Sequence, residues 1–158
     1  LAQIPEFLRG LTLPGPAGGG PGRRAPDCSP GPSADLPLLH TEVMREHLLV
    51  EEGPRGWRLS GLFDFEPAMT GEPEYEFVAV GLFVSCGEVE LLRRALRAYG
   101  YAEASLDADL ERRLLAYALL HRYSHLPWYL QRLPPPPGAR TLEALASHWW
   151  GLGGAAAL

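Results

Sequence analysis

Two short apolar runs in the middle of the chain are joined by a polar turn. Leu48 to Val50 and Leu59 to Phe63 are rich in apolar side chains, and residues 51–56 between them read Glu-Glu-Gly-Pro-Arg-Gly. Glycine and proline supply the backbone dihedrals of tight turns, so this pattern predicts a β-hairpin. A hairpin would place the loop before the first run beside the loop after the second.

Apolar positions elsewhere repeat with the period of an α-helix. The first such segment, residues 1–11, has Ile4, Phe7, Leu8 and Leu11 on one face. Together with the hairpin, these patterns predict an α+β fold that is mostly helical. Four helices are predicted after the hairpin. The first, 75–84, is apolar almost all round, and the second runs from Val89 to Tyr99 and is closed by Gly100. The third is N-capped by Ser105 and stopped by Pro127, and the fourth is N-capped by Thr141.

Composition divides the chain into a flexible part and a globular part. Residues 13–37 are dominated by Pro, Gly, Ser and Ala and hold too few large apolar side chains to bury themselves. We therefore expect a flexible loop there. Residues 38–151 form the expected globular unit, and residues 152–158 are expected to be a frayed tail.

The balance of charges narrows the range of partners. The chain has 158 residues, 46% of them hydrophobic, which is enough for one sizeable core. Its 14 basic and 19 acidic residues give a net charge of -5, which argues against nucleic acid or an anionic membrane as a partner and suits a cationic substrate. Cys28 and Cys86 do not form a disulfide framework, and no apolar run has membrane-spanning length, so we expect a cytoplasmic location.

Acidic and histidine side chains gather in the two loops that the hairpin would bring together. His40, Glu42 and His47 precede the first apolar run, whereas Asp64 and Glu66 follow the second. Groups far apart in the sequence would then converge on one spot. A carboxylate can accept a proton or hold a metal ion, so this spot is the candidate site.

The same loops carry motifs that resemble those of the aminoglycoside phosphotransferases, a branch of the protein-kinase-like fold. The family pattern is His-x-Asp with Asn five residues later, then strand, turn, strand and a second Asp. Residues 40–42 (His-Thr-Glu) stand at His-x-Asp, His47 at the Asn, and residues 64–66 (Asp-Phe-Glu) at the metal motif. Residues 71–76 (Gly-Glu-Pro-Glu-Tyr-Glu) look like Gly-Asp-Pro-x-Tyr-Asp. The later helices and the Trp-Trp-Gly at 149–151 are similar to the hygromycin phosphotransferase group.

The resemblance implies a fold and an activity. The chain would be the C-lobe of a kinase-like fold, with the hairpin at its active-site edge. Residues 1–12 would end the helix before the catalytic loop, which would span 38–50, and the metal loop would span 62–77. The enzyme would transfer the γ-phosphate of ATP to a hydroxyl of an aminoglycoside-type molecule, with Mg²⁺ as cofactor.

The resemblance also implies roles for individual residues. Glu42 would accept the hydroxyl proton, and His40 would brace the loop. Asp64 and His47 would hold the metal. His47 departs from the family's Asn, and Mg²⁺ prefers oxygen ligands to an imidazole. Glu66 and Glu72 would help to receive a cationic sugar.

Groups that hold ATP in this fold are absent from the sequence. All 14 basic residues are Arg, so the lysine that binds the α and β phosphates is not in the chain. No Gly-x-Gly-x-x-Gly loop is present either. The sequence thus resembles a C-lobe without its nucleotide-binding lobe, and we expect these 158 residues alone to lack phosphotransferase activity.

Two other functions remain open from the sequence. The first is a non-catalytic, kinase-like binding module. The second is an iron oxygenase in which His40, Glu42 and a distant histidine such as His121 form a two-histidine, one-carboxylate site. His121 and His125 would also lie one turn apart on a helix, but the glutamate of a zinc peptidase motif is missing between them.

Overall fold

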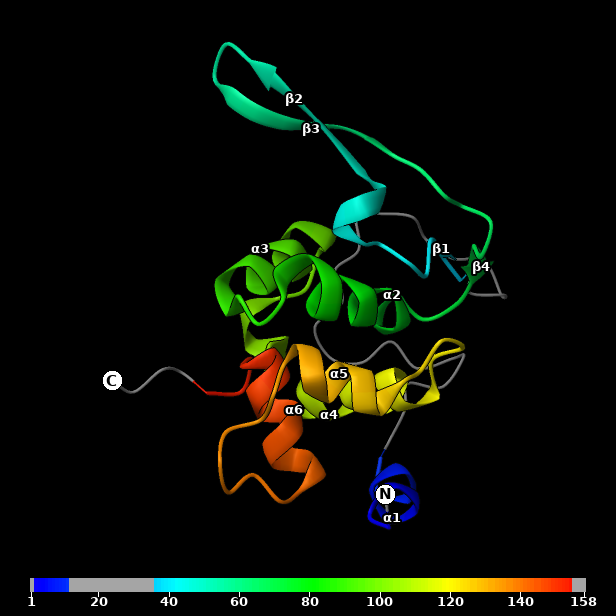
Figure 1. Cartoon of the computed structure of the whole chain (residues 1–158), viewed down its shortest axis with the longest axis vertical. Helices are drawn as coiled ribbons and strands as arrows, with labels where there is room; N and C mark the ends of the chain where they lie inside the picture. Colours follow the sequence, from blue (N-terminus) through cyan, green and yellow to red (C-terminus); the bar gives the residue numbers. More distant parts are fainter. Residues whose placement is uncertain (1, 12–35, 155–158) are drawn as a thin grey trace.

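The computed structural model describes residues 2–11 and 36–154, and these residues form a helical body from which one hairpin projects (Figure 1). The α+β, mostly helical fold expected from the sequence is confirmed. The elements in chain order are α1 (Ile4–Arg9), β1 (Leu38–Leu39), the 3-10 turn η1 (Arg45–His47), β2 (Leu48–Gly53), β3 (Gly56–Leu62), β4 (Met69–Thr70), α2 (Pro73–Ala79), the π-helical turn η2 (Val80–Ser85), α3 (Val89–Tyr99), the 3-10 turn η3 (Glu103–Ser105), α4 (Ala108–Leu120), α5 (Leu126–Arg132) and α6 (Leu142–Trp150).

Strands β2 and β3 form the predicted hairpin. They pair antiparallel from Leu48 opposite Leu62 to Gly53 opposite Gly56, with an irregularity between Leu49 and Val50. The strands therefore extend through most of the expected turn. The small antiparallel pair β1–β4 was not predicted, because strands of two residues show no alternating pattern.

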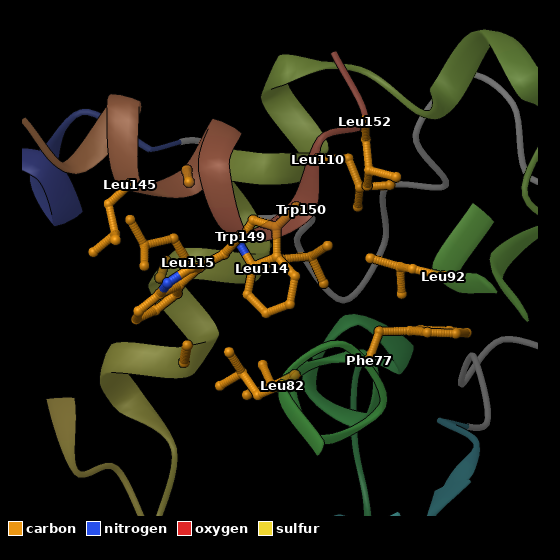
Figure 2. Packing of buried hydrophobic residues seen from close by; sticks show 14 of the residues in the cluster. Phe77, Leu82, Leu92, Leu110, Leu114, Leu115, Leu145, Trp149, Trp150 and Leu152 are labelled. Carbon is orange, nitrogen blue, oxygen red and sulfur yellow. The ribbon is translucent and has the colours of Figure 1, made fainter. Parts of the chain in front are cut away.

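The core lies between α2, η2, α4 and α6 (Figure 2). Leu110 and Leu114 of α4 are fully buried, and Trp150 at the end of α6 is fully buried beside them. Gly81 makes this packing possible, because a Cβ there would lie 2.1 Å from the Trp150 ring. No helix within residues 2–11 and 36–154 is long and apolar enough to cross a membrane.

The structure confirms some predicted helix ends and corrects others. Gly100 closes α3 with a φ of 119°, and the Thr141 hydroxyl caps α6. The predicted N-cap at Ser105 was wrong: Asp107 caps α4 by accepting the Leu110 N–H at 2.9 Å. Helix α4 ends at Leu120, so Pro127 does not stop it. Pro127 instead lies in the first turn of α5.

One further prediction on secondary structure needs correction, and another lies mostly outside the described residues. The segment 75–84 was expected to be one α-helix, but α2 begins at Pro73 and gives way to the π-helical turn at Val80. Of the predicted Pro/Gly-rich loop at 13–37, residues 13–35 lie outside the described residues, together with Cys28.

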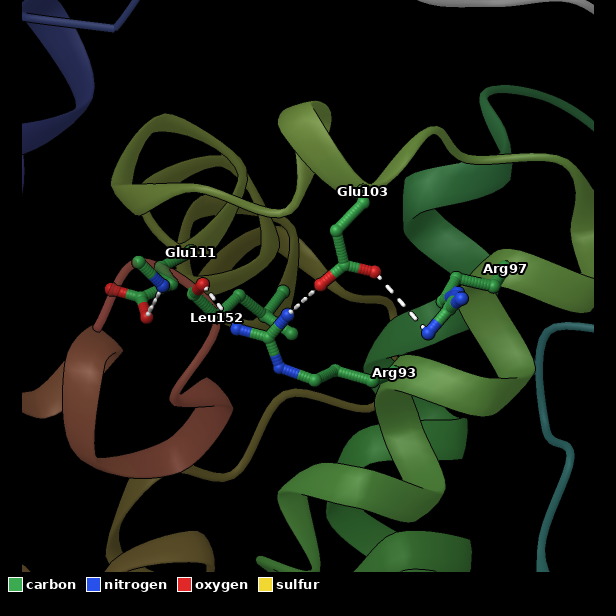
Figure 3. Close-up of polar contacts among 6 residues, drawn as sticks. Arg93, Arg97, Glu103, Glu111 and Leu152 are labelled. Carbon is green, nitrogen blue, oxygen red and sulfur yellow. Dashed lines mark hydrogen bonds and ion pairs between the residues drawn. The ribbon is translucent and has the colours of Figure 1, made fainter. Parts of the chain in front are cut away.

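The C-terminal segment is held in place where a frayed tail was predicted. Leu152 is 1% exposed. As Figure 3 shows, the Arg93 guanidinium donates to the Leu152 carbonyl at 2.7 Å and also binds Glu103. The Gly153 N–H donates to Oε1 of Glu111 at 2.7 Å. Side chains of α3 and α4 therefore clasp the segment that follows α6. Residues 155–158 of the predicted tail lie outside the described residues.

Candidate active site at the root of the hairpin

The two acid-bearing loops meet where the hairpin joins the body, at a place we call the hairpin root (residues 47–48 and 62–64). The Phe63 N–H donates to the His47 carbonyl at 3.2 Å. Just beyond, Nε2 of His47 lies 3.4 Å from Oδ2 of Asp64. The predicted convergence of His47 and Asp64 is therefore present, and it follows from the register of β2 against β3.

His40 ties the first loop to the second. Its Nδ1 accepts the Glu42 N–H at 3.3 Å, which leaves Nε2–H to donate to the Phe63 carbonyl at 2.7 Å. The edge of the ring packs on Phe65, with 4.6 Å between centroids. His40 is buried and both of its nitrogens contact the backbone, so its contacts suit bracing better than chemistry.

Glu76 of α2 binds the backbone of the first loop. Its Oε2 accepts the N–H groups of His40, at 2.5 Å, and of Thr41, at 3.1 Å. Thr41 has a φ of 72°, which is strained for a β-branched residue. Sequence reasoning gave Glu76 no role of its own. The available signal was an acidic residue closing the 71–76 motif.

The neighbouring acid Glu74 anchors α2 to the body. It is 3% exposed, and the Arg113 guanidinium of α4 donates to both of its oxygens. Removing either partner of this pair would be destabilising, because the remaining charge would stay partly shielded from water. The helix that presents Glu76 is thus fixed to the core by charge as well as by apolar packing.

His121 is a second residue whose role sequence reasoning missed. Its Nδ1 accepts the Tyr123 N–H at 3.3 Å, so its Nε2–H donates to the Thr41 carbonyl at 3.2 Å. The ring stacks on Tyr75, with centroids 4.4 Å apart. Burial lowers the pKa of His121 below its ordinary value of 6.5, although the hydrogen bond to Thr41 opposes the shift. The neutral imidazole thus supports the strained residue through its carbonyl group.

These contacts exclude two sequence-based interpretations of the histidines. His121 and His125 do not share a helix, because α4 ends at Leu120; His125 instead caps α5 through the Trp128 N–H. Residues 2–11 and 36–154 contain no group of three or more side chains placed to hold a metal. The iron-oxygenase alternative built on His40, Glu42 and His121 is therefore wrong.

His47 and Asp64 form the part of the root that can hold a cation. The Nδ1–H of His47 donates to the Glu42 carbonyl at 2.7 Å, so Nε2 is the nitrogen that faces Asp64. The Asp64 side chain is 44% exposed. The Asp64 backbone has a φ of 70°, a conformation that is uncommon outside glycine. A carboxylate and an imidazole nitrogen side by side can share a divalent ion.

A pocket opens beside Glu42 of the first loop. Its volume is about 90 Å³. Glu66 is exposed in the second loop and Glu72 precedes α2; neither lines this pocket. The lining residues are Thr41, Glu42, Met44, Ala79, Phe83, His121, Tyr123, His125, Trp128 and Tyr129.

Comparison with known proteins assigns the family. Searches of curated proteins and of solved structures each found no significant match. A family model described as the phosphotransferase enzyme family matches residues 23–116, which include both loops of the hairpin root and helices α2 and α3. The match covers more than half of the 158 residues, and so the chain belongs to the phosphotransferase enzyme family.

Proposed function

We propose that the chain is the C-terminal catalytic portion of a kinase that transfers the γ-phosphate of ATP to a hydroxyl of a small molecule. Membership of the phosphotransferase family gives the class of reaction. The observation that carries the proposal is the hairpin root, where Nε2 of His47 and Oδ2 of Asp64 lie 3.4 Å apart next to the loop that bears Glu42.

Glu42 is the proposed general base. Glu42 is one of the residues that line the pocket, so an alcohol bound there would lie beside the acid that is proposed to accept its proton. Glu76 and His121 hold the preceding residue, Thr41, from two sides. This bracing favours catalysis because displacement of a reacting group by about 1 Å can cost on the order of a hundredfold in rate.

Asp64 and His47 are the proposed ligands of the divalent cation that accompanies ATP. The Asp64 carboxylate fits Mg²⁺, the ion this family generally uses, whereas the imidazole of His47 fits it poorly. When bound, such a cation neutralises charge on the phosphates. The nucleotide-holding lobe is proposed to lie outside these residues, because the sequence has no lysine.

An aminoglycoside-type acceptor is the finer part of the proposal. The net charge of -5 and the acids Glu66 and Glu72 support a cationic sugar. The aromatic rings of Trp128 and Tyr129 in the pocket suit the apolar face of a sugar ring. A non-catalytic module is the second candidate, and what favours it is the longer Glu42 at the position where the family pattern has Asp.

The test compares two substitutions of Glu42 in the protein that carries both lobes. Transfer of radiolabelled γ-phosphate to a panel of aminoglycosides is measured for wild type, Glu42→Asp and Glu42→Gln. We expect Glu42→Asp to retain activity and Glu42→Gln to lose about 10²–10⁴-fold, since only an acid can take the proton. The matched control is Glu46→Gln, an exposed acid in the same loop. Equal rates for Glu42→Gln and wild type would leave the binding module as the better reading.

A further inference from the structure

We propose that His47 and Asp64 form a site that selects a borderline first-row transition-metal dication, such as Co²⁺ or Zn²⁺, over Mg²⁺. The inference rests on the proposed function in one respect only: nucleotide phosphates would complete the coordination shell of the bound ion. It concerns which ion the two side chains prefer. That preference can be measured without any phosphoryl transfer.

The orientation of His47 is the first observation. Its Nδ1–H donates to the Glu42 carbonyl at 2.7 Å, which leaves Nε2 as the nitrogen that faces Asp64. Metal-binding histidines typically donate their other ring N–H to a carbonyl or carboxylate in this way. The His47 side chain is only 15% exposed and packs near Phe63, so it has little freedom to swing away.

The separation of the two ligand atoms is the second observation. Nε2 of His47 and Oδ2 of Asp64 lie 3.4 Å apart. With metal–ligand bonds of about 2.1 Å, atoms at this separation subtend an angle of about 110° at the ion, which is the tetrahedral value preferred by zinc. An octahedral Mg²⁺ with similar bonds needs neighbouring ligands only about 3.0 Å apart. The pair is therefore set wider than the octahedral ion requires.

The chemistry of the ligands points the same way. An imidazole nitrogen suits zinc, cobalt and related ions, whereas Mg²⁺ keeps oxygen ligands and loses water reluctantly. Within residues 2–11 and 36–154 no third metal-binding side chain completes the site. Asp64 is open to solvent, so the remaining positions are available to water or phosphate oxygens. Open positions are typical of catalytic sites and not of closed structural ones.

The test measures metal binding to the 158-residue chain, free of any histidine tag. Co²⁺ is titrated while the visible absorption spectrum is recorded, and Zn²⁺ and Mg²⁺ are then added as competitors. The variants are His47→Asn, which offers an amide oxygen, and Asp64→Asn. His148→Asn is the matched control, because His148 is an exposed histidine on α6. Circular dichroism shows that each variant is folded.

We expect both His47→Asn and Asp64→Asn to weaken Co²⁺ binding by about tenfold or more, by analogy with the loss seen when metal-site residues are altered. Because Mg²⁺ affinity is not reduced in His47→Asn, the ratio of the Mg²⁺ and Co²⁺ dissociation constants falls by the same factor, while His148→Asn matches wild type. An unchanged ratio in folded His47→Asn, or no Co²⁺ spectrum in wild type, overturns the inference and leaves a simple ion pair. Metal selection without phosphoryl transfer by the two-lobed protein would refute only the proposed function.

Discussion

Gly81→Ala tests whether the close approach of η2 to α6 holds the core together. The added Cβ would lie 2.1, 2.8 and 3.2 Å from three carbons of the Trp150 ring. Trp150 is fully buried between α4 and η2, so its ring has no open space into which it can move. Relief requires a shift of the backbone, and overpacking of this kind costs about 1–3 kcal/mol.

The assay is thermal unfolding followed by circular dichroism, with urea unfolding as a second measure. For a chain of this size, each kcal/mol shifts the unfolding midpoint by about 2–4 °C, so we expect a fall of about 2–12 °C. Gly154→Ala is the matched control, because a Cβ there meets nothing within 4 Å. In a double-mutant cycle, Trp150→Phe should recover part of the loss in the Gly81→Ala background, since the smaller ring leaves room for the methyl group. Equal midpoints for Gly81→Ala and Gly154→Ala would refute the packing argument.

Two further predictions concern the bracing of the first loop. Glu76→Ala removes the acceptor of the His40 and Thr41 N–H groups, so urea unfolding should show a free energy of unfolding lower by about 2–3 kcal/mol. The control is Glu90→Ala, which removes an exposed acid and should change this free energy little. Burial holds the pKa of His121 below 6.5, so below that pH the folded chain binds fewer protons than the unfolded chain and stability falls as the pH falls. Thermal midpoints measured from neutral to acidic pH should therefore decline, and the decline should be shallower in His121→Gln; parallel curves would show that His121 is not the group responsible.

The hairpin and most helices could be predicted because their signals are local. Glycine and proline between two apolar runs mark the turn, and Gly100 and Thr141 mark helix ends by their own backbone or side-chain chemistry. The end of α4 carries no such mark. Apolar spacing continues through His121, but the chain turns there, where the His121 ring binds a carbonyl 80 residues earlier. Pro127 predicts a stop because proline cannot continue a helix, but proline also favours the first turn of a helix, where it lies in α5.

The residues of the candidate site also divide into those that could be predicted from the sequence and those that could not. The approach of His47 and Asp64 could be predicted from the sequence, because a hairpin between the two apolar runs brings the loop before the first run beside the loop after the second. Glu76 could not be assigned, because an acid near a helix start is already explained by the helix dipole. Its contact with the N–H groups of residues 40–41 depends on the packing of α2 beside the loop. Local signals do not reveal such contacts between distant segments.

The clasp around the end of α6 has a practical consequence for truncation and fusion. Cutting the chain after Trp150 would remove the Leu152 carbonyl that Arg93 binds and the Gly153 N–H that Glu111 binds, and it would open the core beside Leu110 to water. A Cβ at Gly153 would lie 2.6 Å from the Ala108 backbone nitrogen, so residue 153 should stay glycine. Gly154 is the first position with free space around it. A reporter domain attached beyond that glycine should leave the core as it is. The protein can therefore be immobilised through this end for binding measurements.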